Sequence, residues 1–255
     1  MKNLKITYSI TLILFAVLIY LDTIYGIGLI WYFLLIGLWF TMMAIGSFSL
    51  QLNFYVKAII SKPHLKEKKI AITFDDGPNP EYSLKILDIL KRHRAKATFF
   101  CIGEHVEKHP EILKQIVEEG HDVGNHSFSH DVMIDFNSTE QWLQEIKKSD
   151  NAIQRVTGIK TALFRPPFGV TTPKLAKALK ITEHKVIGWN IRSYDTILKN
   201  PKVIFKRLST RIKPGAIILL HDKQANVIPV LEHLLQFLEE QEYKSVTINQ
   251  LLYEN

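Results

Sequence analysis

Strand-like and helix-like runs alternate along most of the chain, and this alternation limits the folds that are open to it. The strand-like runs are residues 69–74, 97–102, 121–124, 163–165, 185–189 and 216–220. The helix-like runs are residues 82–93, 104–119, 138–157, 201–212 and 227–240, and one more helix opens at Thr172 or Pro173. Because strands separated by helices pair in parallel, the pattern predicts an α/β domain. With the closing runs at residues 243–247 and 248–253, there are about seven such units, which favour a barrel over an open sheet.

The first sixty residues have a different composition. Between Lys5 and Lys57 the only formal charge is Asp22, and two apolar runs cover residues 6–21 and 27–48. A bilayer requires about 20 apolar residues, so we expect a hairpin of two transmembrane helices joined by a turn at residues 22–26. A cleaved signal peptide would have one such run, and core helices of a soluble protein would not be apolar on every side. The expected organisation is an anchor at residues 1–60, a linker at 61–68 and a catalytic domain at 69–255.

Charge and cysteine content narrow the choice of partners. The net charge is +7, but no basic stripe is interleaved with aromatic residues, so nucleic acid is not an expected partner. Lysines flank both outer ends of the predicted hairpin, which favours a cytoplasmic domain. Large domains can cross a membrane despite flanking charge, so the side is left open. The single cysteine, Cys101, excludes an intramolecular disulfide and a zinc site built on several cysteines.

Polar side chains follow the predicted strands at the points where these strands end. They are Asp75 and Asp76, then His126 and His130, then Arg165, then Asp195, and finally His221. In a strand–helix barrel the carboxyl ends of the strands gather on one face, so we expect these groups to meet there.

Asp76, His126 and His130 have the composition of a catalytic zinc site. Two imidazoles and a carboxylate leave one coordination position open for water. The histidines are four residues apart, so a single helical turn would place both rings on one side. The alternatives are a simple Asp-Gly-Pro turn and two surface histidines, and the convergence of strand ends argues against both.

The other strand-end groups have the chemistry of acids, bases and their partners. Asp75 stands beside the predicted ligand and is a candidate general base. Arg165 would hold a carboxylate ionised and oriented, where an ordinary structural ion pair is the alternative. His221 is a candidate general acid tuned by Asp195, where a structural histidine is the alternative.

These motifs resemble the polysaccharide deacetylases of carbohydrate esterase family 4, the NodB-homology domain. The likeness covers residues 69–252 and lies in four motifs. The motifs are TFDDGP at residues 73–78, HSFSH at 126–130, RPPFG at 165–169 and LLHD at 219–222. The resemblance implies a distorted (β/α) barrel. The hairpin that precedes it would place the protein in a membrane, such as the bacterial inner membrane.

The resemblance also implies a reaction, the hydrolysis of an N-acetyl group on a glycan to free amine and acetate. Asp76, His126 and His130 would bind a divalent metal, usually zinc. Asp75 would be the base and His221 the acid, with Arg165 and Asp195 as their partners. A backbone N–H near Phe168 would hold the oxyanion. The implied substrate-binding residues are Pro167, Phe168, Gly169, Trp189 and Leu219.

One motif departs from the family pattern. Arg192 stands where many members have aspartate, and Thr196 stands where many have tryptophan. The lost tryptophan removes a surface on which a sugar could stack, which leaves room for a smaller or lipid-linked glycan. An O-acetyl esterase, a non-sugar amide hydrolase and a catalytically idle glycan-binding protein are the other hypotheses. The sequence does not fix the oligomeric state.

Overall fold

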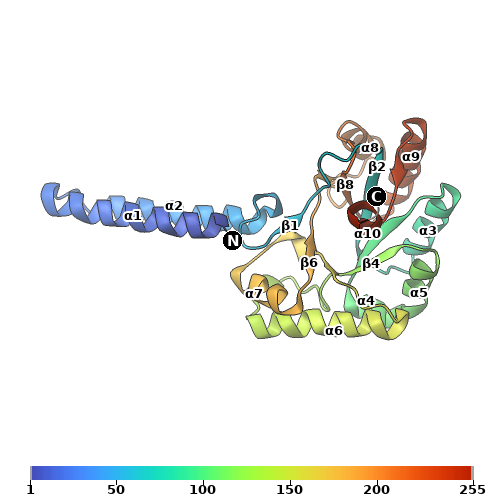
Figure 1. Cartoon of the computed structure of the whole chain (residues 1–255), viewed down its shortest axis with the longest axis horizontal. Coiled ribbons are helices and arrows are strands. Elements are labelled where there is room, and N and C mark those ends of the chain that lie inside the picture. Colours follow the sequence, from blue (N-terminus) through green and yellow to red (C-terminus); the bar gives the residue numbers. More distant parts are fainter. Residues whose placement is uncertain (1, 254–255) are drawn as a thin grey trace.

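The computed structural model describes residues 2–253 and contains one sheet of nine strands (Figure 1). The hydrogen-bonded order is β1-β6-β5-β4-β3-β2-β8-β7, and β9 pairs with β2. The strands are β1 (Ala58–Ile59), β2 (Lys69–Gly77), β3 (Ala97–Cys101), β4 (Asp122–Asn125), β5 (Leu163–Phe164), β6 (Lys185–Ile187), β7 (Ile191–Arg192), β8 (Ile217–His221) and β9 (Lys244–Ser245).

Helices connect the strands and cover the outside of the sheet. The helices of the domain are α3 (Ser83–Arg92), α4 (Gly103–Lys108), α5 (Pro110–Glu118), α6 (Thr139–Thr157), α7 (Pro173–Thr182), α8 (Pro201–Ser209), α9 (Val227–Glu240) and α10 (Ile248–Tyr253). Every strand pair within the sheet is parallel. Strands β6 and β7 follow each other in the chain, yet lie far apart in the hydrogen-bonded order. The fold is therefore the expected distorted (β/α) barrel, and it is open between its two edge strands, β1 and β7.

Strand β2 is the central strand, and its side chains alternate between two environments. Ile70, Ile72 and Phe74 pack in the cluster that the outer helices α3 and α9 cover. Ala71 and Thr73 lie between them in sequence, and Ala71 belongs to a separate cluster with Phe100 and Ile217. Because a strand has a period of two, Asp75 shares the face of Ala71 and Thr73. The strand thus carries a carboxylate into the barrel interior.

The expected helix over residues 104–119 is wrong in one respect, because it is two helices. Helix α4 ends at Lys108 and α5 begins at Pro110, and His109 between them has a non-helical backbone with φ −134° and ψ 56°. Proline restricts the residue before it to extended conformations, and it is well suited to the first turn of a new helix. A capping box formed by Ser138 and Gln141 begins α6.

The domain begins earlier in the chain than residue 69. Strand β1 pairs with β6, although the residues of β1 fall within the expected anchor. Leu50, Phe54 and Tyr55 are buried with side chains of α6 and α7 in one cluster. Residues 50–60 are thus part of the folded domain, so the expected boundary at residue 60 falls too late.

Two apolar helices precede β1 and extend away from the barrel (Figure 1). They are α1 (Lys2–Tyr25) and α2 (Ile30–Phe48), and both are long and apolar enough to cross a membrane. They contact each other through pairs such as Tyr8 with Trp39, whose ring centroids are 6.3 Å apart. Asp22, expected in the turn, lies in the last turns of α1, and the turn is formed by the residues between Tyr25 and Ile30.

Candidate active site

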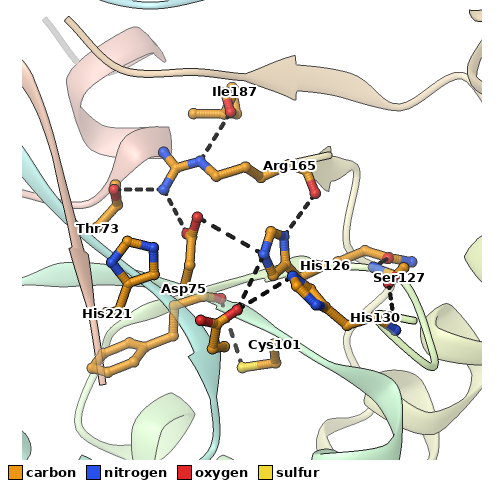
Figure 2. A network of polar contacts seen from close by, with 12 residues as sticks. Thr73, Asp75, Cys101, His126, Ser127, His130, Arg165, Ile187 and His221 are labelled. Atoms are coloured by element: carbon orange, nitrogen blue, oxygen red, sulfur yellow. Dashed lines mark hydrogen bonds and ion pairs between the residues drawn. The ribbon is translucent and has the colours of Figure 1, made fainter. Parts of the chain in front are cut away.

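Strand β2 ends in two adjacent carboxylates that point in different directions. Asp75 continues the alternation of the strand and points into the barrel, whereas Asp76 has a φ of 78°. This left-handed conformation is unfavourable for a residue with a side chain and occurs mainly where the surrounding structure imposes it. The two acids share His126 as a neighbour, whose Nε2 lies 3.9 Å from Asp75 Oδ2, but their other partners differ (Figure 2).

Asp75 is held by a buried arginine. Its Oδ1 accepts a hydrogen bond from Arg165 Nη1 at 2.7 Å, and the same nitrogen donates to Thr73 Oγ1 at 2.7 Å (Figure 2). The rest of the guanidinium donates to the carbonyls of Ile187 and Gly188 at 3.0 Å each. Arg165 is fully buried, and arginine remains protonated in proteins. The arginine therefore fixes the orientation of Asp75 and places a positive charge beside it.

Asp76 lies against both predicted histidines. Its Oδ1 is 3.5 Å from His126 Nε2 and 3.4 Å from His130 Nε2. The Nδ1 of His126 lies 2.8 Å from the carbonyl oxygen of Arg165 (Figure 2). Because a carbonyl can only accept, Nδ1 carries the hydrogen of this contact, and Nε2 is the ring nitrogen that faces Asp76.

The segment that carries the two histidines is a bent loop, so the expected helical turn is wrong. Ser127 has a φ of 65° and His130 a φ of 50°, neither compatible with a right-handed helix. The backbone N–H groups of Phe128 and Ser129 both donate to Glu145 Oε2 at 2.9 Å. These bonds tie the loop to α6. The rings nonetheless converge, with centroids 4.9 Å apart.

The ionisation of this cluster favours metal ligation. Burial alone would raise the pKa of Asp76, but its contact with His126 and nearby positive charge hold that pKa well below its ordinary value. Burial, and after it the charge of His126, lowers the pKa of His130 from 6.5 to about 4. At neutral pH the cluster therefore offers an ionised carboxylate and a neutral His130.

The donor set fits a divalent cation. One ligand atom from each of Asp76, His126 and His130 lies within 4.8 Å of the others. Two imidazole nitrogens and one carboxylate oxygen form a typical set for zinc at a catalytic site. The hydrogen bond from His126 to a carbonyl is the kind of contact that orients a metal-binding imidazole.

His221 and Asp195 form a second pair at the end of β8. Asp195 Oδ1 lies 2.8 Å from His221 Nδ1, and Asp195 Oδ2 accepts the backbone N–H of His221 at 2.7 Å. Burial opposes protonation of His221, but the hydrogen bond and charge of Asp195 outweigh it and raise its pKa. Asp195 itself is buried and also accepts from Ser193 Oγ at 2.7 Å. The imidazolium form of His221 is thus favoured.

A pocket of about 180 Å³ lies over these groups. Four of the five predicted substrate-binding residues line it, namely Phe168, Gly169, Trp189 and Leu219, together with Arg192 and Thr196. Pro167 is buried and is not part of this lining. Phe168 is about half exposed, has a φ of 56°, and its ring centroid is 4.6 Å from that of His130. Arg165 and Asp195 lie behind the pocket wall, where they contact Asp75 and His221.

The sequence interpretation missed three residues that contact this cluster. Lys223 Nζ lies 2.5 Å from Asp76 Oδ2, Thr73 accepts from Arg165, and Glu145 ties down the histidine loop. Thr73 opens the first motif, and Lys223 directly follows the last one. Glu145 lies inside a helix and gives no comparable signal in the sequence.

The fold is a parallel strand–helix barrel, and a carboxylate–histidine cluster lies at the carboxyl ends of its strands. These two features place the chain among barrel proteins with a candidate metal site. The sequence profile of the polysaccharide deacetylases matches residues 62–187. A peptidoglycan-N-acetylglucosamine deacetylase of Bacillus cereus is 35% identical over 191 residues, which are 73% of this chain and 89% of the relative. The chain belongs to the polysaccharide deacetylase family, carbohydrate esterase family 4.

Other relatives show how the likeness is distributed. The peptidoglycan-N-acetylmuramic acid deacetylase PdaC of Bacillus subtilis is 35% identical over 185 residues, but these are 72% of this chain and only 39% of PdaC. The PdaC structure superposes with a TM-score of 0.69 at 34% identity, over 73% of this chain and 90% of that structure. A family 4 pseudoenzyme from Bacillus anthracis superposes with a TM-score of 0.71 at 31% identity, over 77% of this chain and 69% of that one.

Proposed function

We propose that the protein is a metal-dependent deacetylase that hydrolyses the N-acetyl group of a cell-envelope glycan to free amine and acetate. The observation that carries the proposal is the convergence of three groups on one pocket: Asp75 with Arg165, Asp76 with the two histidines, and His221 with Asp195. An amide is a poor electrophile with a poor leaving group. Its hydrolysis therefore requires an activated water, a partner for the oxyanion and an acid, and this pocket supplies candidates for all three.

Asp76, His126 and His130 hold the divalent ion in this proposal, with zinc the first candidate. When bound, such an ion supplies Lewis-acid chemistry that activates water and polarises an acyl oxygen. Asp75 takes a proton from the attacking water, and the hydrogen bond from Arg165 keeps its carboxylate oriented. The backbone N–H of Phe168 donates to the oxyanion, and His221, held protonated by Asp195, gives a proton to the leaving amine.

The proposal includes a membrane location. The two apolar helices would insert as a hairpin, and the contacts of residues 50–60 with the barrel would hold the domain at the membrane surface. The names of the relatives, which include peptidoglycan N-acetylglucosamine and N-acetylmuramic acid deacetylases, support an envelope glycan as the substrate. A reporter after Asn255 whose signal depends on compartment, checked by protease access, would establish the side that the domain faces.

The decisive experiment measures acetate release from N-acetylglucosamine oligomers by the zinc-loaded, detergent-solubilised protein. Asp75→Asn removes the base and leaves the predicted metal ligands in place. We expect it to lower kcat about a hundredfold or more, with little change in bound zinc. Asp88→Asn, at an exposed position on α3, is the matched control. Undiminished acetate release by Asp75→Asn would refute the mechanism, and tight glycan binding without turnover by the wild type would indicate an idle binding protein.

A further inference from the structure

A second hollow, of about 230 Å³, adjoins the candidate active-site pocket. The two share Phe168, Gly169, Trp189 and Arg192 as lining residues. Its other walls come from residues 48–51, at the end of α2, and from Arg207 and Arg211 after β7. We call this hollow the arginine groove. It lies where the apolar hairpin joins the domain.

The arginine groove has a concentrated positive charge. Arg192, Arg207 and Arg211 line it, and its lining contains no Asp or Glu. Within residues 2–253, the arginines that form ion pairs with carboxylates are others, namely Arg92, Arg155 and Arg165. The three guanidinium groups of the groove therefore keep charge and donor capacity for a ligand.

Local contacts orient these guanidinium groups. Arg207 Nε donates to the carbonyl oxygen of Arg192 at 2.8 Å, and Arg211 Nη1 donates to the carbonyl oxygen of Arg207 at 3.3 Å. The guanidinium carbons of Arg207 and Arg192 lie 4.4 Å and 5.0 Å from the centre of the Tyr194 ring. Stacking on an aromatic face and a hydrogen bond from one nitrogen leave other N–H groups of each guanidinium available to a ligand. Positioned forks of this kind suit the oxygens of a phosphate.

The location of the arginine groove limits which kind of phosphate compound can bind there. Because Arg192 and Trp189 line both hollows, a group in the arginine groove lies next to the sugar in the active-site pocket. Phe48 ends the second apolar helix and also lines the groove, so with the hairpin inserted the groove opens at the membrane interface. A phosphate that is both attached to a sugar and located at a membrane surface belongs to a lipid-linked saccharide.

We propose that the arginine groove binds the phosphate or diphosphate that joins an N-acetylated saccharide to a membrane lipid. The substrate class is then a lipid-linked glycan, deacetylated on the sugar nearest the lipid. This proposal rests on the proposed deacetylase function and names the substrate of that same site.

The test compares three substrates of the full-length protein in neutral detergent micelles. The first is N-acetylglucosamine joined through a diphosphate to a long isoprenoid alcohol. The second carries the same sugar on the same alcohol through a neutral ether, and the third is N-acetylglucosamine 1-phosphate without lipid. We expect kcat/KM to be highest for the first, by about tenfold over the ether, because each charge-assisted contact contributes to its binding. The lipid-free phosphate tests whether the lipid itself is needed, and an equal kcat/KM for the first and third substrates would contradict the proposal.

Matched variants isolate the groove from the rest of the surface charge. Arg207→Gln with Arg211→Gln removes two groove charges. Lys202→Gln with Lys206→Gln removes two charges outside the groove, on α8, the helix that carries Arg207. The first double variant should lose about tenfold on the diphosphate substrate and stay within twofold on the ether. The lysine variant should stay within twofold on both. Arg211→Gln alone, at an exposed position, covers the case in which the loss of Arg207 perturbs the fold.

Binding of the radiolabelled diphosphate probe separates the groove from the catalysis. The wild type should bind it, inorganic pyrophosphate should displace it, and the arginine variants should weaken it about tenfold. If the probe binds in this way but the protein releases no acetate, the proposed function is refuted and the proposed phosphate site is still supported. Three results would each overturn the groove proposal. The arginine variants could lose as much affinity for the ether probe as for the diphosphate probe, or the lysine variant could lose as much affinity as the arginine variants. Phosphatidylglycerol could also displace the probe as effectively as pyrophosphate does.

Discussion

The pair of His221 and Asp195 predicts the pH dependence of the reaction. Asp195 raises the pKa of His221, so the imidazolium persists to higher pH than in a free histidine. Activity that needs this proton falls as pH rises through that raised pKa. Asp195→Asn removes the negative charge, lowers the pKa of His221, and should move the alkaline limb of kcat/KM to lower pH. An alkaline limb that stays in place in this variant would remove His221 from the role of general acid.

Asp222 provides a stability prediction with a definite sign. The residue is fully buried next to Ser83, and its Oδ1 has no hydrogen-bond partner in the described chain. Burial is the main cause that raises its pKa from 3.8 to about 7. The folded state therefore binds this proton more tightly than the unfolded state, and stability falls as pH rises from about 4 to about 7.

Asp222→Asn removes this cost, because the amide does not ionise and its oxygen can still accept from Ser83. At pH 8 the full rise in pKa corresponds to about 4 kcal/mol, which is an upper limit. We expect thermal unfolding of the variant at pH 8 to occur at a higher temperature than for the wild type. The difference should shrink at pH 4.5, and a constant difference across this range would show that ionisation is not its cause.

Much of the candidate site could be predicted because its residues end strands. Asp75, Arg165 and His221 are far apart in sequence, but the parallel sheet brings their positions to one face. The contact of Lys223 with Asp76 could not be predicted, since it depends on the direction of a single side chain after β8. The contact of Asp76 with both histidines likewise depends on the left-handed backbone conformation of Asp76.

At the scale of elements, helix α6 supports the predicted metal site through Glu145. Its carboxylate accepts the N–H groups of Phe128 and Ser129 between the two histidines. Glu145→Ala should lower the zinc affinity about ten- to a hundredfold, as is usual when support for a ligand is lost. Competition with a chelator measures this affinity, and Glu140→Ala, in the first turn of the same helix, is the control. Equal affinity in both variants would mean that the loop keeps its shape without α6.

The order of elements could be predicted from hydrophobic pattern, but their breaks and edges could not. The apolar residues have a helical period on both sides of His109, and the break between α4 and α5 depends on Pro110. Strand β1 has only two residues and joins the sheet through β6, more than 120 positions later in the chain. A strand of two residues has no recognisable alternation of apolar and polar side chains, so its residues were assigned to the anchor.

At the scale of the molecule, residues 50–60 join the hairpin to the barrel and predict where the chain can be cut. A protein that begins at Ser49 keeps Leu50, Phe54, Tyr55 and Val56 in the core, whereas one that begins at Ser61 loses them. Burial of each side chain contributes about 1.5–3 kcal/mol, against a total stability of about 5–15 kcal/mol. We expect the first to unfold cooperatively and the second to be largely unfolded by circular dichroism. Equal stability of the two would contradict the packing described for this segment.

The same segment limits how far the domain can travel. Asn3 Nδ2 donates to the carbonyl of Leu52 at 2.8 Å, and the N–H of Thr171 donates to the carbonyl of Ser47 at 3.0 Å. No slack chain therefore separates α2 from the barrel, in contrast to a flexible tether of glycine and serine. With its hairpin inserted, the protein would diffuse in two dimensions with its substrate, and its active site would reach only a thin layer next to the bilayer. Its reach would be set by the radius of one domain, so a glycan far out in a thick wall would have to come to it.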